Sequence, residues 1–255
     1  MKKYSFICLV SLLSLVSCAH PAVKLDCPYP VETFKTKSGE VQIAMIHHGT
    51  LAVMYNDFMI QIDPLISHSG TDIDYSSFPK ADVILITHEH GDHLQKEAIE
   101  YVSDENTRLI LNRKSSDALD GAGEVMNNGE SVTLAKKVTL TAVPAYNTTP
   151  GRENMHPKGN GNGYIIEMDG FKLYVSGDTE DIEEFSDFPE DIDLAFLSAN
   201  QPFTMTVDQC VNAARVLKPA NLVPYHLGNT EVEQIKSKLD SLNSGINIYL
   251  YETLR

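Results

Sequence analysis

Hydrophobic positions along the chain form short runs that predict β-strands more often than helices. Three such runs near the N-terminal end cover residues 41–46, 51–55 and 58–62. They are rich in β-branched residues and too short for core helices, which favours strands. Asn56 and Asp57 separate the last two runs and predict a tight hairpin. The apolar run 82–86 predicts a further buried strand by the same argument.

The second half of the chain repeats this pattern of short apolar runs. Strands are expected over residues 108–111, 138–143, 164–168, 171–175, 194–197, 221–224 and 246–251. Asp169 and Gly170 lie between two of these runs and predict another hairpin. The strongly acidic stretch 178–193 is expected to be mostly a solvated helix and turn.

Three segments show signs of helices. The first helix is expected over residues 94–102. The second begins with a capping box, Thr206 and Gln209, and its apolar face is formed by Val207, Val211, Ala214 and Leu217. The third begins with a similar pair, Thr230 and Glu233. Strands in both halves, each set followed by helices, predict an α/β protein with two packed sheets and helices outside.

The first residues have the pattern of an export signal. Basic residues precede a short apolar stretch, and residues 1–17 are expected to be a signal peptide that is too short to span a membrane. The stretch ends at Cys18 and resembles a bacterial lipobox, which implies cleavage before Cys18 and acylation of its thiol. Residues 18–39 are expected to be a tether. The sequence therefore predicts a protein anchored by lipid to a membrane of the bacterial cell envelope, facing outside the cytoplasm.

The charge of the chain argues against a nucleic-acid partner. The formal net charge is −15, and removal of residues 1–17, which carry two lysines and no acidic residue, lowers it to −17. A surface this acidic repels phosphate backbones, and the sequence has no cluster of Lys and Arg that would offset it.

Two of the four cysteines remain in the expected mature chain, Cys27 and Cys210. A disulfide between them is allowed in an exported protein. Cys210 falls on the apolar face of a predicted helix, so a buried free thiol is its expected state.

A cluster of metal-binding residue types follows the predicted strand 82–86. It consists of His88, His90, Asp92 and His93. On an extended chain His88 and His90 point to the same side, so both imidazoles can reach one metal ion. Gly91 then lets the chain turn, which directs Asp92 and His93 toward a second ion beside the first. So dense a polar cluster at a strand end is costly unless something binds it.

The order of this motif, then Gly177-Asp178-Thr179, then Tyr225-His226, resembles the metallo-β-lactamase superfamily. Three further sequence features resemble the branch near ascorbate-6-phosphate lactonase and N-acylphosphatidylethanolamine phospholipase D. They are Ala145-Tyr146-Asn147, His156-Pro157-Lys158-Gly159, and Met205 before the capped helix. The resemblance implies a four-layer αββα sandwich, the metallo-β-lactamase fold, with a two-metal site at one edge. Residues 40–255 are expected to form this hydrolase domain.

The resemblance also implies a set of metal ligands. His88 and His90 correspond to ligands of the first ion, and Asp178 corresponds to the residue that bridges the two ions. Asp92, His93 and His226 correspond to ligands of the second ion. These positions imply two divalent ions, with zinc as the expected metal and manganese or iron(II) as alternatives.

One position departs from the family. Related enzymes place a histidine ligand of the first ion where this chain has Asn147. An amide oxygen is a weak ligand for zinc, so His156 from the following loop is favoured as the third ligand. Asn147 stays the alternative.

These ligands predict a hydrolase in which two ions generate a hydroxide that attacks an ester, lactone or phosphodiester of a small-molecule or lipid substrate. Asp92 is expected to orient the nucleophile and carry a proton. Asp63 is a candidate acceptor for the N–H of a ligand histidine. Three further residues are candidate substrate contacts: Tyr146, His47 and His48. The sequence leaves the substrate and the oligomeric state open.

Two other functions are compatible with the sequence. The imperfect third ligand motivates a non-catalytic, metal-binding envelope lipoprotein. Hydrolysis of β-lactams is a weaker alternative, because Asp178 stands where β-lactamases of this fold usually have different chemistry at the second ion.

Overall fold

The computed structural model describes residues 24–255. The expected signal peptide of residues 1–17 and the expected lipidation site Cys18 lie outside the described residues. In the part of the chain that is described, no helix is both long and apolar enough to cross a membrane.

The first of two seven-stranded sheets is built from the N-terminal half of the chain, in the order β1-β2-β3-β4-β7-β8-β9. Its strands are β1 (Val31–Lys35), β2 (Glu40–His47), β3 (Thr50–Tyr55), β4 (Phe58–Ile62), β7 (Val83–Leu85), β8 (Arg108–Leu111) and β9 (Glu124–Val125). Strands β1 to β4 pair antiparallel, and β4, β7, β8 and β9 pair parallel. The short pair β5 (Ser67–His68) and β6 (Thr71–Asp72) forms a separate ribbon.

The second sheet repeats this arrangement with the C-terminal half, in the order β10-β11-β12-β13-β14-β15-β16. Its strands are β10 (Ser131–Thr133), β11 (Val138–Ala145), β12 (Gly161–Met168), β13 (Phe171–Val175), β14 (Leu194–Ser198), β15 (Asn221–Tyr225) and β16 (Asn247–Ile248). Strands β10 to β13 pair antiparallel, and β13 to β16 pair parallel.

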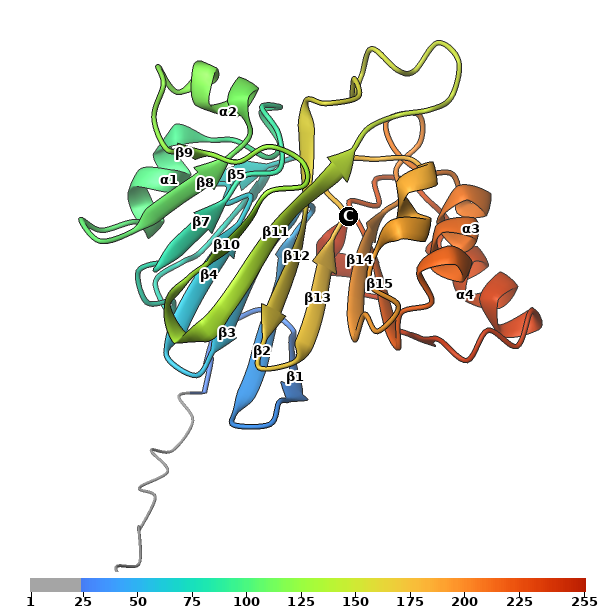
Figure 1. Cartoon of the computed structure of the whole chain (residues 1–255), viewed down its shortest axis with the longest axis horizontal. Helices are drawn as coiled ribbons and strands as arrows, with labels where there is room; N and C mark the ends of the chain where they lie inside the picture. Colours follow the sequence, from blue (N-terminus) through green and yellow to red (C-terminus); the bar gives the residue numbers. More distant parts are fainter. Residues whose placement is uncertain (1–23) are drawn as a thin grey trace, which may run out of the picture.

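Helices cover the outer face of each sheet, which gives the four-layer αββα sandwich (Figure 1). Helices α1 (Lys96–Val102) and α2 (Arg113–Ala118) accompany the first sheet, and α3 (Val207–Leu217) and α4 (Val232–Ser241) accompany the second. Three 3₁₀ turns complete the list: η1 (Ala135–Lys137), η2 (Glu183–Asp187) and η3 (Glu252–Leu254). The predicted α/β class and the four-layer fold are confirmed.

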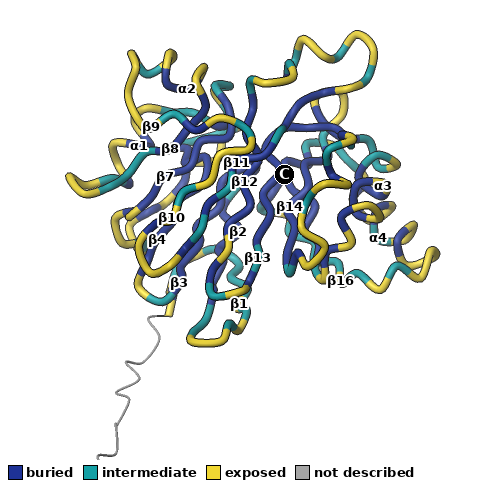
Figure 2. The backbone as a smooth tube through the Cα atoms, viewed as in Figure 1, coloured by how far each residue is buried: buried dark blue, intermediate teal, exposed yellow. Residues whose placement is uncertain are grey.

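Three apolar clusters fill the spaces between the four layers, and buried segments run through the centre of the molecule (Figure 2). Alternation along strands assigns side chains to these clusters. In β2, Ile43 packs between the two sheets, whereas its neighbour Ala44 packs on the helical side with Ile99 of α1. Tyr174 of β13 packs with Leu217 of α3 on the other side of the molecule.

The tether expected over residues 18–39 is wrong in its second part. Residues 31–35 form β1, an edge strand that pairs antiparallel with β2. Leu25 is buried in the apolar cluster that contains Ala44 and Ile99, between the first sheet and α1. Val31 packs against the cluster beside α1 and Phe34 against the cluster between the sheets, and an edge position tolerates the prolines that precede the strand.

The capping box expected at Thr230 and Glu233 is also wrong. Helix α4 starts one residue later, with Glu231 at the N-cap and no side-chain capping bond. The Thr230 hydroxyl instead donates to the Ala199 carbonyl oxygen. In α3, by contrast, both halves of the predicted capping box, Thr206 and Gln209, are present.

Cys27 and Cys210 are both free thiols, so the disulfide that an exported protein would allow is not formed. Cys210 is fully buried on the inner face of α3, as expected, and burial raises the pKa of its thiol to about 12.

Candidate metal centre

Polar residues that follow strands of both sheets meet at one edge of the sandwich. His48 follows β2, Asp63 follows β4 and His88 follows β7 in the first sheet, whereas Asp178 follows β13 and His226 follows β15 in the second. Within each sheet these strands run in the same direction, so their carboxyl ends lie at the same edge.

The loop between β11 and β12, residues 146–160, rises above this edge at the top of Figure 1. It carries His156, whose Nδ1 lies 3.1 Å from the Phe203 carbonyl oxygen. That contact leaves His156 Nε2 to face His88 and His90, and these three residues form a group whose ligand atoms all lie within 4.8 Å of one another. His88 Nε2 is 3.1 Å from His90 Nδ1.

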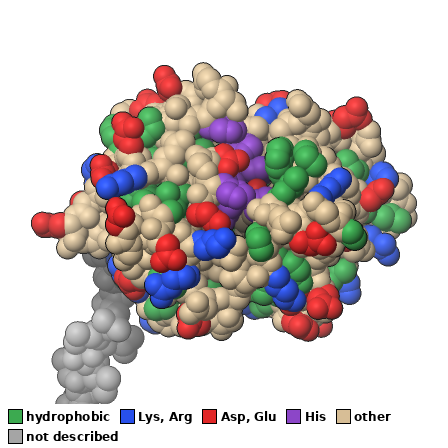
Figure 3. All heavy atoms as spheres, turned by 90° about the horizontal axis from the view of Figure 1, so that it is seen from above, with side chains coloured by type: hydrophobic (Ala, Val, Ile, Leu, Met, Phe, Trp, Pro, Cys, Tyr) green, Lys and Arg blue, Asp and Glu red, His purple; other side chains and the backbone are tan. Residues whose placement is uncertain are grey.

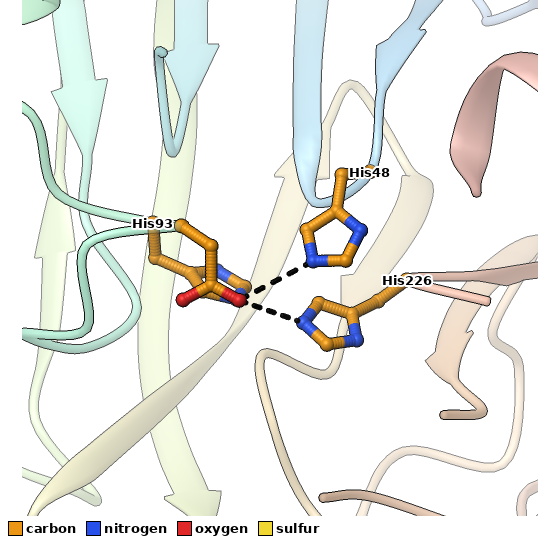
Figure 4. A group of neighbouring side chains, drawn as sticks. His48, His93 and His226 are labelled. Atoms are coloured by element: carbon orange, nitrogen blue, oxygen red, sulfur yellow. Dashed lines mark hydrogen bonds and ion pairs between the residues drawn. The ribbon is translucent and has the colours of Figure 1, made fainter. Parts of the chain in front are cut away.

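A second group contains His48, Asp92, His93 and His226, again with ligand atoms within 4.8 Å of one another. Asp92 Oδ2 lies 3.3 Å from His48 Nε2 and 3.5 Å from His226 Nε2, the two contacts drawn in Figure 4. Among residues 24–255, no hydrogen-bond partner of good geometry faces His93 Nε2.

The Asp178 carboxylate lies between the two groups. Its Oδ2 is 3.2 Å from His156 Nε2 and 3.9 Å from His88 Nε2 on one side. Towards the second group, Oδ2 is 3.4 Å from His226 Nε2 and Oδ1 is 3.4 Å from His93 Nε2. This carboxylate therefore contacts residues of both groups.

Asp63 fixes the orientation of the His93 ring by contacting Nδ1, the ring nitrogen that points away from Asp178. The carboxylate is fully buried, and its Oδ2 lies 2.7 Å from His93 Nδ1. It also accepts hydrogen bonds from the Thr87 backbone N–H (2.7 Å) and the Thr87 hydroxyl (2.6 Å). The predicted contact between Asp63 and a motif histidine is present, and it turns His93 Nε2 toward the centre.

The electrostatics of the cluster keep the carboxylates of Asp178 and Asp92 ionised. Burial alone would raise the pKa of Asp178, but His226 and His93 beside it hold that pKa well below its usual range. The same pattern lowers the pKa of Asp92, where burial alone would raise it and the close contacts with His226 and His48 outweigh burial.

The histidines respond to the same surroundings in different ways. Burial lowers the pKa of His88 well below its ordinary value and that of His48 to about 4, so both rings are neutral. Burial would also lower the pKa of His93, but the carboxylates of Asp178 and Asp63 raise it to about 9.

Four buried atoms that face this centre make no well-aligned hydrogen bond among the described residues, although each lies 3.2–3.5 Å from an ionisable partner: His93 Nε2, His156 Nε2, His226 Nε2 and Asp178 Oδ1. Buried polar atoms nearly always make a hydrogen bond, so four such atoms in one place need an explanation. Imidazole nitrogens and carboxylate oxygens are also the ligand types that zinc and related ions bind. The residues present therefore fit divalent cations.

A cavity of about 810 Å³ opens above the centre. Figure 3 shows histidine and acidic side chains gathered in a hollow on this face. Residues from both groups line the cavity, together with His47, His68, Met155, Asn200, Phe203 and Arg255. Of the candidate substrate contacts, His47 and His48 lie on its wall. Tyr146 does not, because its hydroxyl donates to Glu184 outside the cavity.

Asn147 supports the loop that carries His156. Its side-chain N–H group donates to the Phe203 carbonyl oxygen (2.8 Å) and to the Arg152 carbonyl oxygen (3.3 Å). Its backbone N–H donates to the His156 carbonyl oxygen. Asn147 and His156 thus both contact Phe203, and only His156 is part of the histidine group.

Sequence reasoning missed two residues at the centre. Asn200 follows β14, and its amide nitrogen lies 3.4 Å from His226 Nδ1. His68 lies on the cavity wall with its ring centre 4.2 Å from that of His48. The available signal for Asn200 was a polar residue three positions after the predicted strand 194–197, and no pattern marks His68.

Comparison with known proteins gives consistent results. The family described as the beta-lactamase superfamily domain matches residues 56–227. A UPF0173 metal-dependent hydrolase of Thermococcus kodakarensis is 34% identical over 66% of this chain and 76% of its own length. Another from Thermococcus onnurineus is 29% identical over 73% of this chain and 84% of its own length.

Solved structures agree with this assignment. A protein from Parabacteroides distasonis, described as a candidate metal-dependent hydrolase, has 46% identity and a TM-score of 0.82, covering 88% of this chain and 99% of its own. The metallo hydrolase Igni18 from Ignicoccus hospitalis shares the fold at 22% identity, with a TM-score of 0.69, covering 84% of this chain and 96% of its own.

Proposed function

From its membership of the beta-lactamase superfamily domain family, among the UPF0173 metal-dependent hydrolases, we propose a function for this chain. It cleaves a carboxylic ester, a lactone or a phosphodiester at a centre for two divalent cations. Four buried ligand atoms beneath the cavity, none of which makes a well-aligned hydrogen bond among the described residues, carry this proposal. Without a cation they would be a costly defect in the interior.

We assign the first cation to His88, His90 and His156, and the second to Asp92, His93 and His226, with Asp178 between them. The separations around Asp178 support this division, since its two oxygens face nitrogens of both groups at 3.2–3.9 Å. The nitrogen-rich ligand set favours zinc, and manganese or iron(II) are the alternatives.

Bound cations would supply Lewis acidity, which lowers the pKa of a shared water and polarises the attacked oxygen. The protein residues hold the reactants around them. Asp92 is the carboxylate most open to the cavity, with 35% of its side chain exposed, and it is ionised. It can therefore orient the attacking water and accept its proton. Phe203 and Met155 provide apolar surface on the wall for the rest of the substrate.

Elemental analysis of purified protein, with assays on a generic phosphodiester, a lactone and a simple ester, tests the proposal. The expected result is two cations per chain and turnover of at least one substrate, abolished by chelation. His156→Ala is expected to lose about one cation per chain, whereas Asn147→Ala keeps both. Two cations without turnover of any of these classes would favour a non-catalytic metal-binding protein.

We also propose, from the sequence of residues 1–18, that the mature chain is anchored in the cell envelope through Cys18. An anchored hydrolase lies beside lipid-derived substrates, which makes them candidates. Partition of wild-type protein into detergent, and of Cys18→Ser into the aqueous phase, is the expected result. An enzyme that hydrolyses soluble esters and leaves phospholipid vesicles intact would exclude the lipid substrate.

A further inference from the structure

His48 lies in the second group of ligands although it is far from the motif of residues 88–93 in sequence. Its side chain is buried, and its Nε2 faces the Asp92 carboxylate at 3.3 Å. The two nitrogens that contact Asp92 Oδ2 thus come from opposite halves of the chain, His48 from the first sheet and His226 from the second (Figure 4).

The backbone holds these two histidines in an uncommon conformation. His48 and His226 both have a φ of 53°, in the left-handed region that residues other than glycine seldom adopt. The His226 N–H donates to the His48 carbonyl oxygen, and the His48 N–H donates to the Thr253 carbonyl oxygen. Their rings lie with centres 3.8 Å apart. Strained residues of this kind persist where the surrounding structure fixes them, often at functional sites.

We propose that His48 is a protein ligand of the second cation and supplies Nε2 alongside Asp92, His93 and His226. This inference rests on the proposed two-cation centre and adds to it a residue first considered only as a substrate contact.

The spacing of the atoms agrees with a shared ion. Nitrogen and oxygen ligands at about 2.0–2.1 Å from one zinc ion, in directions that differ by about 90° or more, lie about 3 Å or more from each other. The separations of Asp92 Oδ2 from His48 Nε2 and His226 Nε2 are 3.3 and 3.5 Å. His48 Nε2 also lies within 4.8 Å of the ligand atoms of all three other residues.

The neighbouring histidines provide matched controls. His47 is adjacent in sequence, and His68 packs against the His48 ring, yet neither belongs to a group of ligand atoms in the described part of the chain. If His48 only shaped the cavity wall, substitution of any of the three would have comparable effects on cation binding.

The test is cation affinity, measured on protein stripped with a chelator and then titrated with Zn²⁺ or Co²⁺ against a chromophoric competitor. His48→Asn suits the purpose because asparagine tolerates the left-handed conformation. We expect this variant to keep one tight cation and to bind the other at least tenfold more weakly. We also expect a changed Co²⁺ absorption spectrum. His47→Asn and His68→Asn are expected to bind both cations as the wild type does.

Unchanged affinity for both cations in His48→Asn would overturn the inference, whether or not KM rises. A circular-dichroism melt confirms folding, and His48→Gln replaces the first variant if it unfolds. Because cation binding is measured without substrate, absence of esterase activity in the wild type would contradict the proposed function and leave this result standing.

Discussion

Asp63 orients the ligand His93 without being a metal ligand itself, so its substitution tests how much cation binding depends on this orientation. Its carboxylate accepts from the Thr87 N–H, the Thr87 hydroxyl and His93 Nδ1. Asparagine has a similar shape but replaces one acceptor oxygen with a donor, so it leaves one of these three donors unpaired. We predict that Asp63→Asn weakens cation binding about 10–100-fold and destabilises the fold by about 1–3 kcal/mol.

Competition with a chelator measures the first effect, and urea unfolding of the cation-free protein measures the second. Asp72→Asn is the control, because Asp72 is exposed on β6. Equal cation affinity for Asp63→Asn and wild type would show that His93 does not depend on this contact.

At the residue scale, the sequence predicts candidate ligands most directly where they share one short motif, and it gives little signal for residues that only the fold brings together. His88, His90, Asp92 and His93 stand within six positions, so their chemistry can be seen directly. His48 and Asn200 each stand alone as a strand-end residue. Asn200 comes beside His226 because β14 pairs with β15, and His48 comes beside His226 because the two sheets pack together.

At the scale of elements, Glu180 anchors the loop of residues 146–160. Its buried Oε2 accepts from the backbone N–H groups of Thr148 (2.8 Å) and Thr149 (2.6 Å). Arg152 approaches Oε1 at 3.8 Å. Hydrogen bonds to a charged acceptor contribute about 1.5–3 kcal/mol each. We predict that Glu180→Gln makes this loop open more often, and that trypsin then cleaves after Arg152 or Lys158 at least about tenfold faster.

Mass spectrometry of timed digests identifies the cleavage site. Glu183→Gln is the matched control, because the Glu183 side chain is 86% exposed and contacts only Lys158 among the loop residues. Equal cleavage rates for Glu180→Gln and wild type would contradict the anchoring role.

The two capping patterns of the sequence lead to a second prediction for elements. Thr206 accepts from the Gln209 N–H at 3.1 Å and so caps α3, whereas Glu233 makes no capping bond to α4. Thr206→Ala is expected to lower the free energy of unfolding by about 1 kcal/mol. Glu233→Ala is expected to change it by less than about 0.5 kcal/mol. Chemical denaturation measures both changes. An equal decrease in the free energy of unfolding for the two variants would show that the capping bond in α3 does not stabilise the protein.

Strands and hairpins followed from the sequence better than the elements at the sheet edges. The runs at 108–111 and 171–175 match β8 and β13 residue for residue. The run expected at 246–251 yields only β16, a strand of two residues. Helix α2 was not expected, because its sequence is polar and it buries mainly two serines. Elements at a sheet edge bury only one side, so their sequences contain fewer apolar residues and show a weaker pattern.

At the scale of the whole molecule, the two halves of the chain form sheets with the same succession of antiparallel and parallel pairs. The centre lies where corresponding edges of these sheets meet. Apolar periodicity predicts two packed sheets, but it contains no information on which edges adjoin. That arrangement became predictable only through the resemblance to a known family, since the order of the motifs was its signature.

The net charge of the molecule leads to a prediction about substrates. The chain carries a formal charge of −15, and Arg255 is the one Lys or Arg among the described residues that line the cavity. The guanidinium of Arg255 is already occupied by the carbonyl oxygens of Gly228 and Thr230 and by Glu252. The long-range field should therefore slow the approach of anions, and salt should reduce this effect.

We predict that, at low ionic strength, kcat/KM is several-fold higher for p-nitrophenyl butyrate than for p-nitrophenyl hemisuccinate, an ester of equal acyl length that carries a carboxylate. Raising the salt concentration from about 10 to about 150 mM shortens the screening length from about 30 to about 8 Å. The difference between the two esters is then expected to shrink, because only the anionic ester gains. A hemisuccinate rate that equals the butyrate rate and does not respond to salt would mean that the bound cations dominate the field at the cavity. Anionic phosphodiesters would then be as acceptable to this enzyme as neutral esters.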